Sequence, residues 1–315
     1  MTAKVFIDGE AGTTGLEIRQ RLAGRRDLEV ISIDERRRKD IEARRDLLNG
    51  ADAVILCLPD EAAREAVGLV ESNSVKVIDA STAHRTAPGW DYGFPEMARG
   101  QRAALAGSHR ISNPGCWPTG FIALVRTLVE AGLIPADWPV GVHGVSGYSG
   151  GGKAMIAEFE DRSAADHTEV PYRLYAMTLA HKHVPEMTAY AGLTYRPVFT
   201  PSVGRYRKGM LVEVPLALEA LPGAPQLADV HDCLVEAYAD EPFVEVASRP
   251  AAAAVQTLDP EGLNGTNRMR LFAFGADGGG QARLVALFDN LGKGAAGAAV
   301  QNLNIALQLP ETAGL

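Results

Sequence analysis

The sequence predicts an α/β fold: a Rossmann-like, doubly wound parallel sheet with an inserted α+β domain. Strand and helix patterns alternate through residues 4–80, a glycine-rich turn follows the first strand, and a small-residue helix follows a strand near the C-terminus. Such alternation is typical of a parallel sheet covered by helices on both faces. A length of 315 residues is enough for about two domains.

The first part of the chain carries the parallel sheet. Four apolar runs have the composition of buried parallel strands: residues 5–7, 28–33, 53–58 and 75–79. Three segments between them have the pattern of helices: residues 13–23, 36–48 and 60–71.

The rest of the chain predicts a second domain and a return to the first. Alternating segments at 209–218, 243–246 and 269–275 indicate a mixed domain with a substantial sheet. A strand at 284–288 then leads into a small-residue helix that can pack closely on the nucleotide domain. We therefore expect a Rossmann domain of residues 1–116 plus 290–315, and an inserted catalytic and oligomerisation domain of residues 117–289.

The composition excludes several classes of protein. A net charge of −8 provides no overall basic surface for generic nucleic-acid binding. The three cysteines form no CxxC pair, which argues against a disulfide framework or a zinc site and suits a reducing compartment. The N-terminus has no signal-peptide pattern, and no apolar run is long enough to span a membrane. We expect a soluble, cytoplasmic protein that binds neither nucleic acid, membrane nor metal.

A glycine-rich turn lies between the first strand and the first helix. Gly9, Gly12 and Gly15 are spaced as GxxGxxG, with Thr13 and Thr14 at the start of the helix. The first two glycines permit a tight turn and close approach of the backbone to a pyrophosphate, and the third lets helix and strand pack closely. This context predicts dinucleotide binding by these five residues.

The end of the second strand bears on the choice between NAD and NADP. Asp34 lies near the position where an acid would hold the ribose 2′-hydroxyl, whereas Arg36, Arg37 and Arg38 offer cations for a 2′-phosphate. At least two of these arginines are explained as the solvated start of a charged helix. We favour NADP(H), with Arg36 as the cofactor-binding residue.

Cys116 is the main candidate for a nucleophile. It follows the turn residues Pro114 and Gly115 and precedes an apolar helical segment with Pro118 at an early position. A thiol at a helix N-terminus faces the positive end of the helix dipole, which favours the thiolate. The alternative is a small buried hydrophobe. Cys57 and Cys233 lie in apolar segments and are interpreted as core residues.

Two cations are candidates for binding an anionic substrate. Arg85 follows a strand C-terminus, where open α/β sheets bind their ligands. Lys153 ends the segment 143–153, which is too glycine-rich for a packed strand and is predicted to be a loop whose amides, around Ser146 and Gly147, approach a ligand. Ala154 follows the lysine, so the segment lacks the P-loop pattern and ATP binding is not supported.

His181 and His183 lie just before a helix that opens at Pro185. If the backbone is extended there, both side chains point to one face. General acid/base catalysis beside a thiolate is one use for the pair, and a purely structural role is the other. No Cys, Asp or further His nearby offers a third metal ligand, which argues against a metal site.

Together these motifs resemble the N-acetyl-γ-glutamyl-phosphate reductase family, in its shorter type. The segments that carry the resemblance are residues 9–15, 112–120, 146–153, 181–186 and 293–296. The Asn-Pro-Gly-Cys and His-x-His-x-Pro-Glu elements are specific in combination. The wider group includes aspartate-semialdehyde dehydrogenase and has a Rossmann domain with an inserted catalytic and dimerisation domain.

The resemblance implies residue roles and an activity. Cys116 would be the nucleophile, His183 the acid/base, and His181 its companion. NADPH would be the cofactor, an acyl phosphate the substrate, arginine biosynthesis the pathway, and a homodimer or homotetramer the assembly. The remaining expected site residues are Asn113, with Arg85 and Lys153, for the substrate, and Ser146, Gly147 and Asn290 for the cofactor.

Two alternatives remain open from the sequence. Aspartate-semialdehyde dehydrogenase would use the same cysteine chemistry on a substrate with a free amine. A nucleotide-sensing Rossmann protein would bind the cofactor without turnover and would need neither Cys116 nor the histidine pair.

Overall fold

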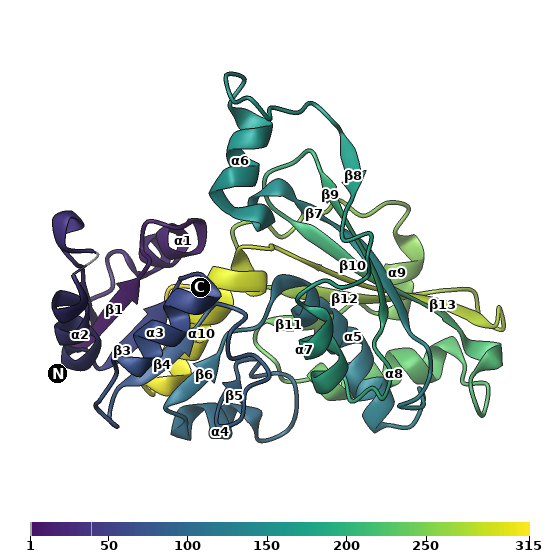
Figure 1. Ribbon diagram of the computed structural model, residues 1–315. Coiled ribbons are helices and arrows are strands. Elements are labelled where there is room, and N and C mark those ends of the chain that lie inside the picture. The colour runs from purple at the N-terminus through teal and green to yellow at the C-terminus, as the bar shows by residue number, and fades with distance from the viewer. Residues whose placement is uncertain (1, 39) are drawn as a thin grey trace. The chain divides into compact units, whose positions relative to one another are not determined.

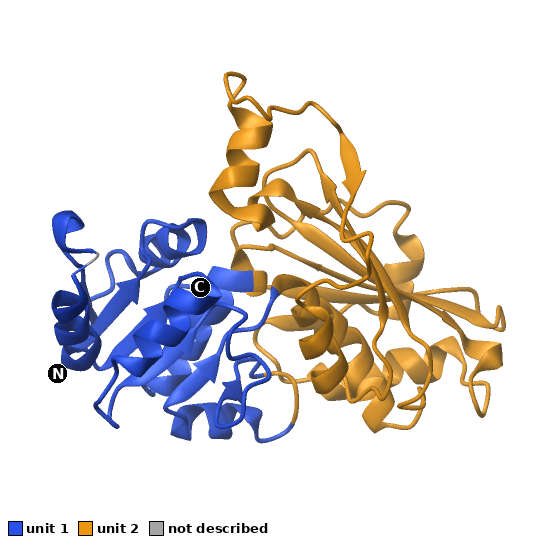
Figure 2. Cartoon of the chain, in the orientation of Figure 1, with its two compact units in different colours: residues 1–95, 99–115, 295–315 blue, residues 96–98, 116–294 orange. Residues whose placement is uncertain are grey.

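The computed structural model describes residues 2–38 and 40–315, which form two compact units (Figure 2). Unit 1 contains the described residues of 1–95, 99–115 and 295–315; unit 2 contains residues 96–98 and 116–294. The units differ from the expected domain ranges at Cys116, residues 290–294 and residues 96–98, all in unit 2. Cys116 opens a helix of unit 2, and Glu96 pairs there with Lys293.

Unit 1 is built on a six-stranded parallel sheet in the order β2-β1-β3-β4-β6-β5 (Figure 1). Its strands are β1 (Ala3–Asp8), β2 (Leu28–Ile31), β3 (Ala53–Leu56), β4 (Lys76–Asp79), β5 (Asp91–Tyr92) and β6 (Arg110–Ser112). The four predicted parallel strands are thus confirmed. Because β2 and β3 lie on opposite sides of β1, the direction of winding reverses at the carboxyl ends of β1 and β3, the usual ligand site of such sheets.

Helices cover both faces of this sheet. They are α1 (Thr13–Leu22), α2 (Ile41–Gly50), α3 (Asp60–Gly68), α4 (Gln101–Gly107) and α10 (Gly297–Ala306). Val5 and Ile7 of β1 pack with α1 and α10, whereas Phe6 packs on the other face with α2 and α3. This alternation follows from the two-residue period of a strand and buries both faces of the sheet.

The predicted helix at 36–48 is divided in the structure. A 3₁₀ turn, η1 (Glu35–Arg37), precedes α2, and each has its own cap. The Asp34 carboxylate accepts a hydrogen bond from the Arg36 amide at 2.8 Å, and the Asp40 carboxylate accepts one from the Ala43 amide at 3.1 Å. Each aspartate therefore caps the start of its own helical segment, so the chain forms two short segments where the pattern predicted one helix.

Unit 2 is built on a seven-stranded mixed sheet in the order β11-β12-β13-β10-β7-β9-β8. Its strands are β7 (Gly141–Gly147), β8 (Tyr172–Leu174), β9 (Val198–Gly204), β10 (Met210–Ala217), β11 (Val244–Val246), β12 (Met269–Phe274) and β13 (Gln281–Phe288). Its helices are α5 (Cys116–Glu130), α6 (Gly152–Glu160), α7 (Val184–Tyr190), α8 (Leu227–Tyr238) and α9 (Arg249–Ala254). The helix α5 packs on β10 and β13, with α7 and α8 beside it (Figure 1).

The glycine-rich segment at 143–147 is a strand, so its prediction as a loop was wrong. It forms most of β7, between β10 and β9. A Cβ atom at Gly144 would collide with the Leu211 carbonyl oxygen, and one at Gly147 would lie 2.6 Å from the Arg207 carbonyl oxygen. Glycine is needed at both positions because the backbone of a neighbouring segment approaches closely. The pattern of apolar side chains in the sequence does not indicate such a backbone contact.

Candidate active site

The glycine-rich turn after β1 has the geometry expected for a pyrophosphate. Gly9 adopts φ +89°, and a Cβ atom there would collide with the Cys57 carbonyl after β3. The Gly12 amide donates to the Gly9 carbonyl at 2.9 Å, and a Cβ atom at Gly15 would lie 2.6 Å from the same carbonyl. The N-cap residue of α1, which starts at Thr13, is Gly12, and glycine has no side chain to cap the first turn. The turn therefore presents backbone amides at a helix N-terminus and fits a dinucleotide.

Glu10, which the sequence reasoning did not single out, fixes this turn. Its carboxylate accepts hydrogen bonds from Arg19 at 2.7 Å and from the Ser32 hydroxyl at 3.0 Å, and it lies 3.8 Å from Arg38. These contacts join the turn to α1 and to the segment after β2. No sequence spacing pointed to them, because they depend on the packing of β1 beside β2.

The three arginines after Asp34 are not equivalent. Arg37 pairs with Asp40 at 2.9 Å, and Arg38 lies near Glu35 as well as Glu10. Arg36 is exposed and forms no ion pair with any described residue. Of the three, Arg36 is therefore the guanidinium that neighbouring carboxylates leave available to an added anion.

Cys116 is the first residue of α5, one residue before the predicted start of this helix, and its side chain is half-buried. Two anchors hold the turn before it. The Asn113 amide donates to the Asp79 carbonyl at 2.7 Å, and the Arg85 Nε donates to the Asn113 carbonyl at 3.0 Å. The Asn113 side chain also donates to the Ala295 carbonyl at 3.0 Å. Arg85 and Asn113 thus fix the start of the segment that presents the thiol.

A π-turn, η4 (Gly292–Ala296), lies against Cys116. A Cβ atom at Gly294 would lie 2.9 Å from the Cys116 Cβ. The preceding residue, Lys293, is 1% exposed and forms an ion pair at 2.7 Å with Glu96, which is fully buried. Because loss of one member would leave an uncompensated buried charge, this pair fixes the π-turn behind the thiol.

His181 and His183 lie together in a turn, so the extended backbone considered from the sequence was wrong. The His183 amide donates to His181 Nδ1 at 3.1 Å, and the two rings meet edge to face with centroids 4.7 Å apart. An Nδ1 that accepts this hydrogen bond leaves the proton of neutral His181 on Nε2. His183 is buried and caps α7, whose second residue is Pro185.

Aromatic side chains pack against His181, and the sequence reasoning had missed them. The ring of Phe199 lies 5.2 Å from that of His181 and 5.3 Å from that of Trp117, centroid to centroid. Tyr175 lies 5.8 Å from His181, and its hydroxyl accepts a hydrogen bond from Trp117 Nε1 at 2.9 Å. Trp117 directly follows Cys116, so its position next to the thiol is the one signal in the sequence that pointed to this cluster.

The remaining expected residues divide into a cluster and an exposed cation. Asn290 donates to the Ser149 hydroxyl at 3.0 Å and accepts from the Gly209 amide at 2.8 Å. The Ser146 hydroxyl bonds the adjacent Gly147 carbonyl at 3.2 Å. The structure thus brings Asn290 to the end of β7, where Ser146 and Gly147 lie. Lys153 is exposed in the first turn of α6.

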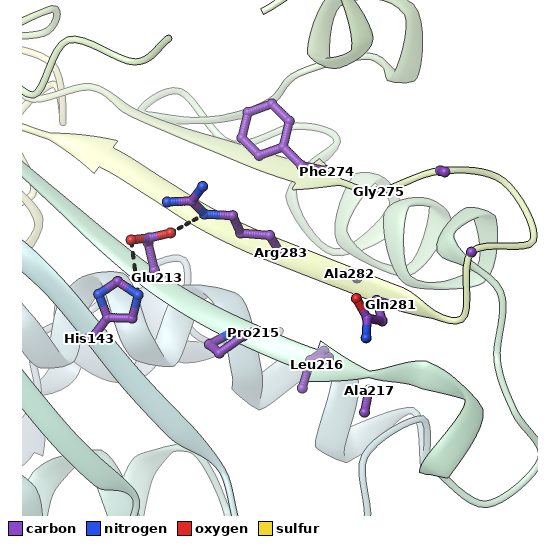
Figure 3. Close-up of a pocket in the computed structure, with 12 residues that line it drawn as sticks. His143, Glu213, Pro215, Leu216, Ala217, Phe274, Gly275, Gln281, Ala282 and Arg283 are labelled. Atoms are coloured by element: carbon purple, nitrogen blue, oxygen red, sulfur yellow. Dashed lines mark hydrogen bonds and ion pairs between the residues drawn. The ribbon is translucent and has the colours of Figure 1, made fainter. Parts of the chain in front are cut away.

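A separate hollow of about 720 Å³ lies on the sheet of unit 2, and Figure 3 shows its lining. Glu213 is paired there with Arg283 and, at 3.1 Å, with His143. The hollow is lined by none of Cys116, His181 and His183. It is therefore distinct from the candidate catalytic groups.

No helix within residues 2–38 and 40–315 combines the length and the apolar character needed to cross a membrane. Within the same described residues, no group of three or more His, Cys, Asp or Glu side chains is arranged to hold a metal ion.

Comparison with solved structures shows the fold. The Vibrio cholerae aspartate semialdehyde dehydrogenase II complexed with ASA has a TM-score of 0.73 and 15% identity, and the match covers 98% of this chain and 99% of that one. The Francisella tularensis aspartate semialdehyde dehydrogenase has a TM-score of 0.68 and 14% identity, with 96% and 99% covered. At these identities the likeness establishes a shared fold and nothing about substrate.

Comparison of sequences shows the family. Residues 4–105 match the family model described as semialdehyde dehydrogenase, NAD binding domain, and residues 116–290 match the one described as semialdehyde dehydrogenase, dimerisation domain. Relatives from Brucella anthropi and Brucella ovis, named N-acetyl-γ-glutamyl-phosphate reductase, are 56% and 55% identical over 308 residues, which is 98% of this chain and 99% of each relative. The chain therefore belongs to the N-acetyl-γ-glutamyl-phosphate reductase family.

Proposed function

We propose that the protein reduces N-acetyl-γ-glutamyl phosphate to N-acetylglutamate 5-semialdehyde with NADPH, in arginine biosynthesis. The observation that carries the proposal is a thiol at the first residue of α5 in the same unit as the buried His183 and its neighbour His181, in a chain 56% identical to a relative of that name. A nucleotide sensor would require neither group. We place the reaction in the cytoplasm and assign it to a homodimer or homotetramer, for which the match to a dimerisation domain is the support.

The first chemical step is assigned to Cys116. The thiolate attacks the acyl carbon, the bond between that carbon and the phosphate oxygen breaks, and phosphate leaves as a thioester forms. We assign the backbone amides at the start of α5 to stabilise the oxyanion that forms on the way. The thioester accepts hydride more readily than an oxygen ester does, which explains the need for sulfur.

The second step requires a proton donor. A bound nicotinamide dinucleotide supplies hydride to the thioester carbon. We assign His183 to protonate the resulting oxyanion, which gives a hemithioacetal. His183 then takes that proton back as the carbon–sulfur bond breaks, so that the aldehyde leaves and the thiolate is restored.

The binding roles follow from position and charge. For the cofactor we propose the turn formed by Gly9, Gly12, Thr13, Thr14 and Gly15, with Arg36 on the 2′-phosphate and the cluster of Ser146, Gly147 and Asn290 as a further contact. For the substrate we propose Arg85, Asn113 and Lys153, with the phosphate and the α-carboxylate divided between the two cations. The anchoring role of Asn113 beside Arg85 supports placing the substrate close to Cys116.

The test is phosphate-dependent reduction of NADP by the purified protein, with N-acetylglutamate semialdehyde and aspartate semialdehyde offered in parallel. The proposal predicts turnover of the first substrate alone. Turnover of aspartate semialdehyde instead would overturn the substrate and keep the thioester chemistry. A protein that binds NADPH and turns over neither aldehyde would contradict the enzymatic function.

A further inference from the structure

Tyr175 lies in the aromatic cluster that carries the candidate catalytic groups of unit 2. Its hydroxyl accepts a hydrogen bond at 2.9 Å from the Nε1 of Trp117, which is 2% exposed. Trp117 follows Cys116 in the first turn of α5. The same helical turn therefore presents the thiol and fixes the position of the Tyr175 hydroxyl.

The backbone and ring of Tyr175 are held as well. Its amide donates to the Pro201 carbonyl of β9 at 3.3 Å, and its ring meets that of His181 edge to face at 5.8 Å. The ring contact, the backbone hydrogen bond and the hydrogen bond from Trp117 together fix the position of the hydroxyl. The hydroxyl can still donate its own proton.

The proton of this hydroxyl is available to a ligand. In the part of the chain that the structure describes, the hydroxyl donates to no acceptor, and no hydrogen bond joins it to Cys116. Burial and the nearby charge of Cys116 raise the pKa of Tyr175, so the phenol stays protonated at neutral pH. The group is thus a neutral donor, close enough to the sulfur to respond to its charge and without a bond to it.

We propose that the Tyr175 hydroxyl donates a hydrogen bond to the acyl oxygen of the substrate bound at Cys116. The inference rests on the proposed function. The oxygen is weakly basic in the thioester and becomes negatively charged as hydride adds, so the hydrogen bond strengthens in the transition state. Tyr175 holds this oxygen and keeps its own proton, whereas His183 transfers one. The two residues therefore have different roles.

The test compares Tyr175→Phe with Tyr195→Phe in the assay of phosphate-dependent NADP reduction with N-acetylglutamate semialdehyde. Phenylalanine at 175 keeps the ring beside His181 and removes only the hydroxyl, and Tyr195, which is 60% exposed, is the matched control. We expect Tyr175→Phe to lower kcat roughly 100-fold, the effect of removing one oxyanion donor. The KM should change little, and the pH profile of Cys116 alkylation by iodoacetamide should match the wild type. The control should keep the wild-type kcat.

Four results separate the possibilities. Equal kcat for the two variants would overturn the inference, as would a shift in the alkylation profile of Tyr175→Phe, because Tyr175 would then act on the thiol. Trp117→Phe, which removes the donor to Tyr175, should reproduce part of the loss in kcat. If the wild-type protein does not turn over N-acetylglutamate semialdehyde, the proposed function fails before any variant is compared.

Discussion

At the scale of single residues, the histidine pair shows how a local hydrogen bond divides two similar side chains. His181 Nδ1 accepts a hydrogen bond from the His183 amide, so His181 holds the turn, and the buried His183 is the residue that we propose for proton transfer. We expect His183→Asn to lower kcat roughly 100- to 10,000-fold, the range for loss of a general acid/base. His181→Asn should lower it less. Steady-state kinetics of the two variants decide the assignment, and the reverse ranking would move the acid/base role to His181.

Two of the three cysteines, Cys57 and Cys233, have a raised pKa, which lowers their reactivity. Burial, with the charges of Asp79 and Asp8, raises the pKa of Cys57 to about 12, and burial also raises the pKa of Cys233. A thiol below its pKa is protonated and unreactive, so at about pH 8 both should resist iodoacetamide while Cys116 is alkylated. Peptide mass spectrometry over time measures the three rates. Labelling of Cys57 as fast as that of Cys116 would contradict this expectation.

Residues were predictable from the sequence where their role is local. Gly9 and Cys116 stand in short motifs whose geometry follows from neighbouring residues, so the tight turn at Gly9 and the helix start beside Cys116 could be predicted. Glu10 and Tyr175 escaped notice because their partners, Ser32 and Trp117, come from segments that only folding brings near. Such contacts cannot be predicted from the spacing of residues in the sequence.

At the scale of elements, the π-turn η4 leaves little room for added volume beside Cys116. A methyl group at Gly294 would meet Cys116 and would also lie 3.3 Å from the Asp289 carbonyl oxygen. We expect Gly294→Ala to destabilise the protein by about 1–3 kcal/mol, the usual effect of overpacking. It should also slow alkylation of Cys116. The measurements are thermal unfolding and the alkylation rate.

Gly50→Ala is the matched control for this substitution. Gly50 is the last residue of α2, and a Cβ atom there meets nothing within 4 Å. It should leave the melting temperature and the rate of Cys116 alkylation near those of the wild type. If Gly294→Ala behaves like Gly50→Ala, the π-turn does not constrain the thiol.

Elements were predicted well where apolar pattern and backbone conformation agree. The four apolar runs of unit 1 became parallel strands, and the helix after Cys116 starts where its turn residues placed it. The strand at 143–147 was missed because glycines, which usually weaken a strand, serve there to admit the Leu211 and Arg207 backbone.

At the scale of the whole molecule, the order of elements along the chain explains why an insertion could be anticipated. The sheet of unit 1 takes up residues before Gly115, and α10 returns to the same unit after Ala295, packing against α1 and α4. A final small-residue helix after a strand is the sequence feature that predicted this return. The boundaries were displaced by a few residues because buried partners such as Glu96 and Lys293 are far apart in sequence.

The central claim is that the reaction passes through a thioester on Cys116. The direct measurement is the intact mass of the protein after incubation with N-acetylglutamate semialdehyde and NADP, with phosphate omitted so that the acyl group is not released to it. The account predicts an N-acetylglutamyl adduct that maps to Cys116, forms together with an equivalent of NADPH, and is absent from Cys116→Ser. NADPH formation without an adduct, or an adduct on another residue, would contradict it.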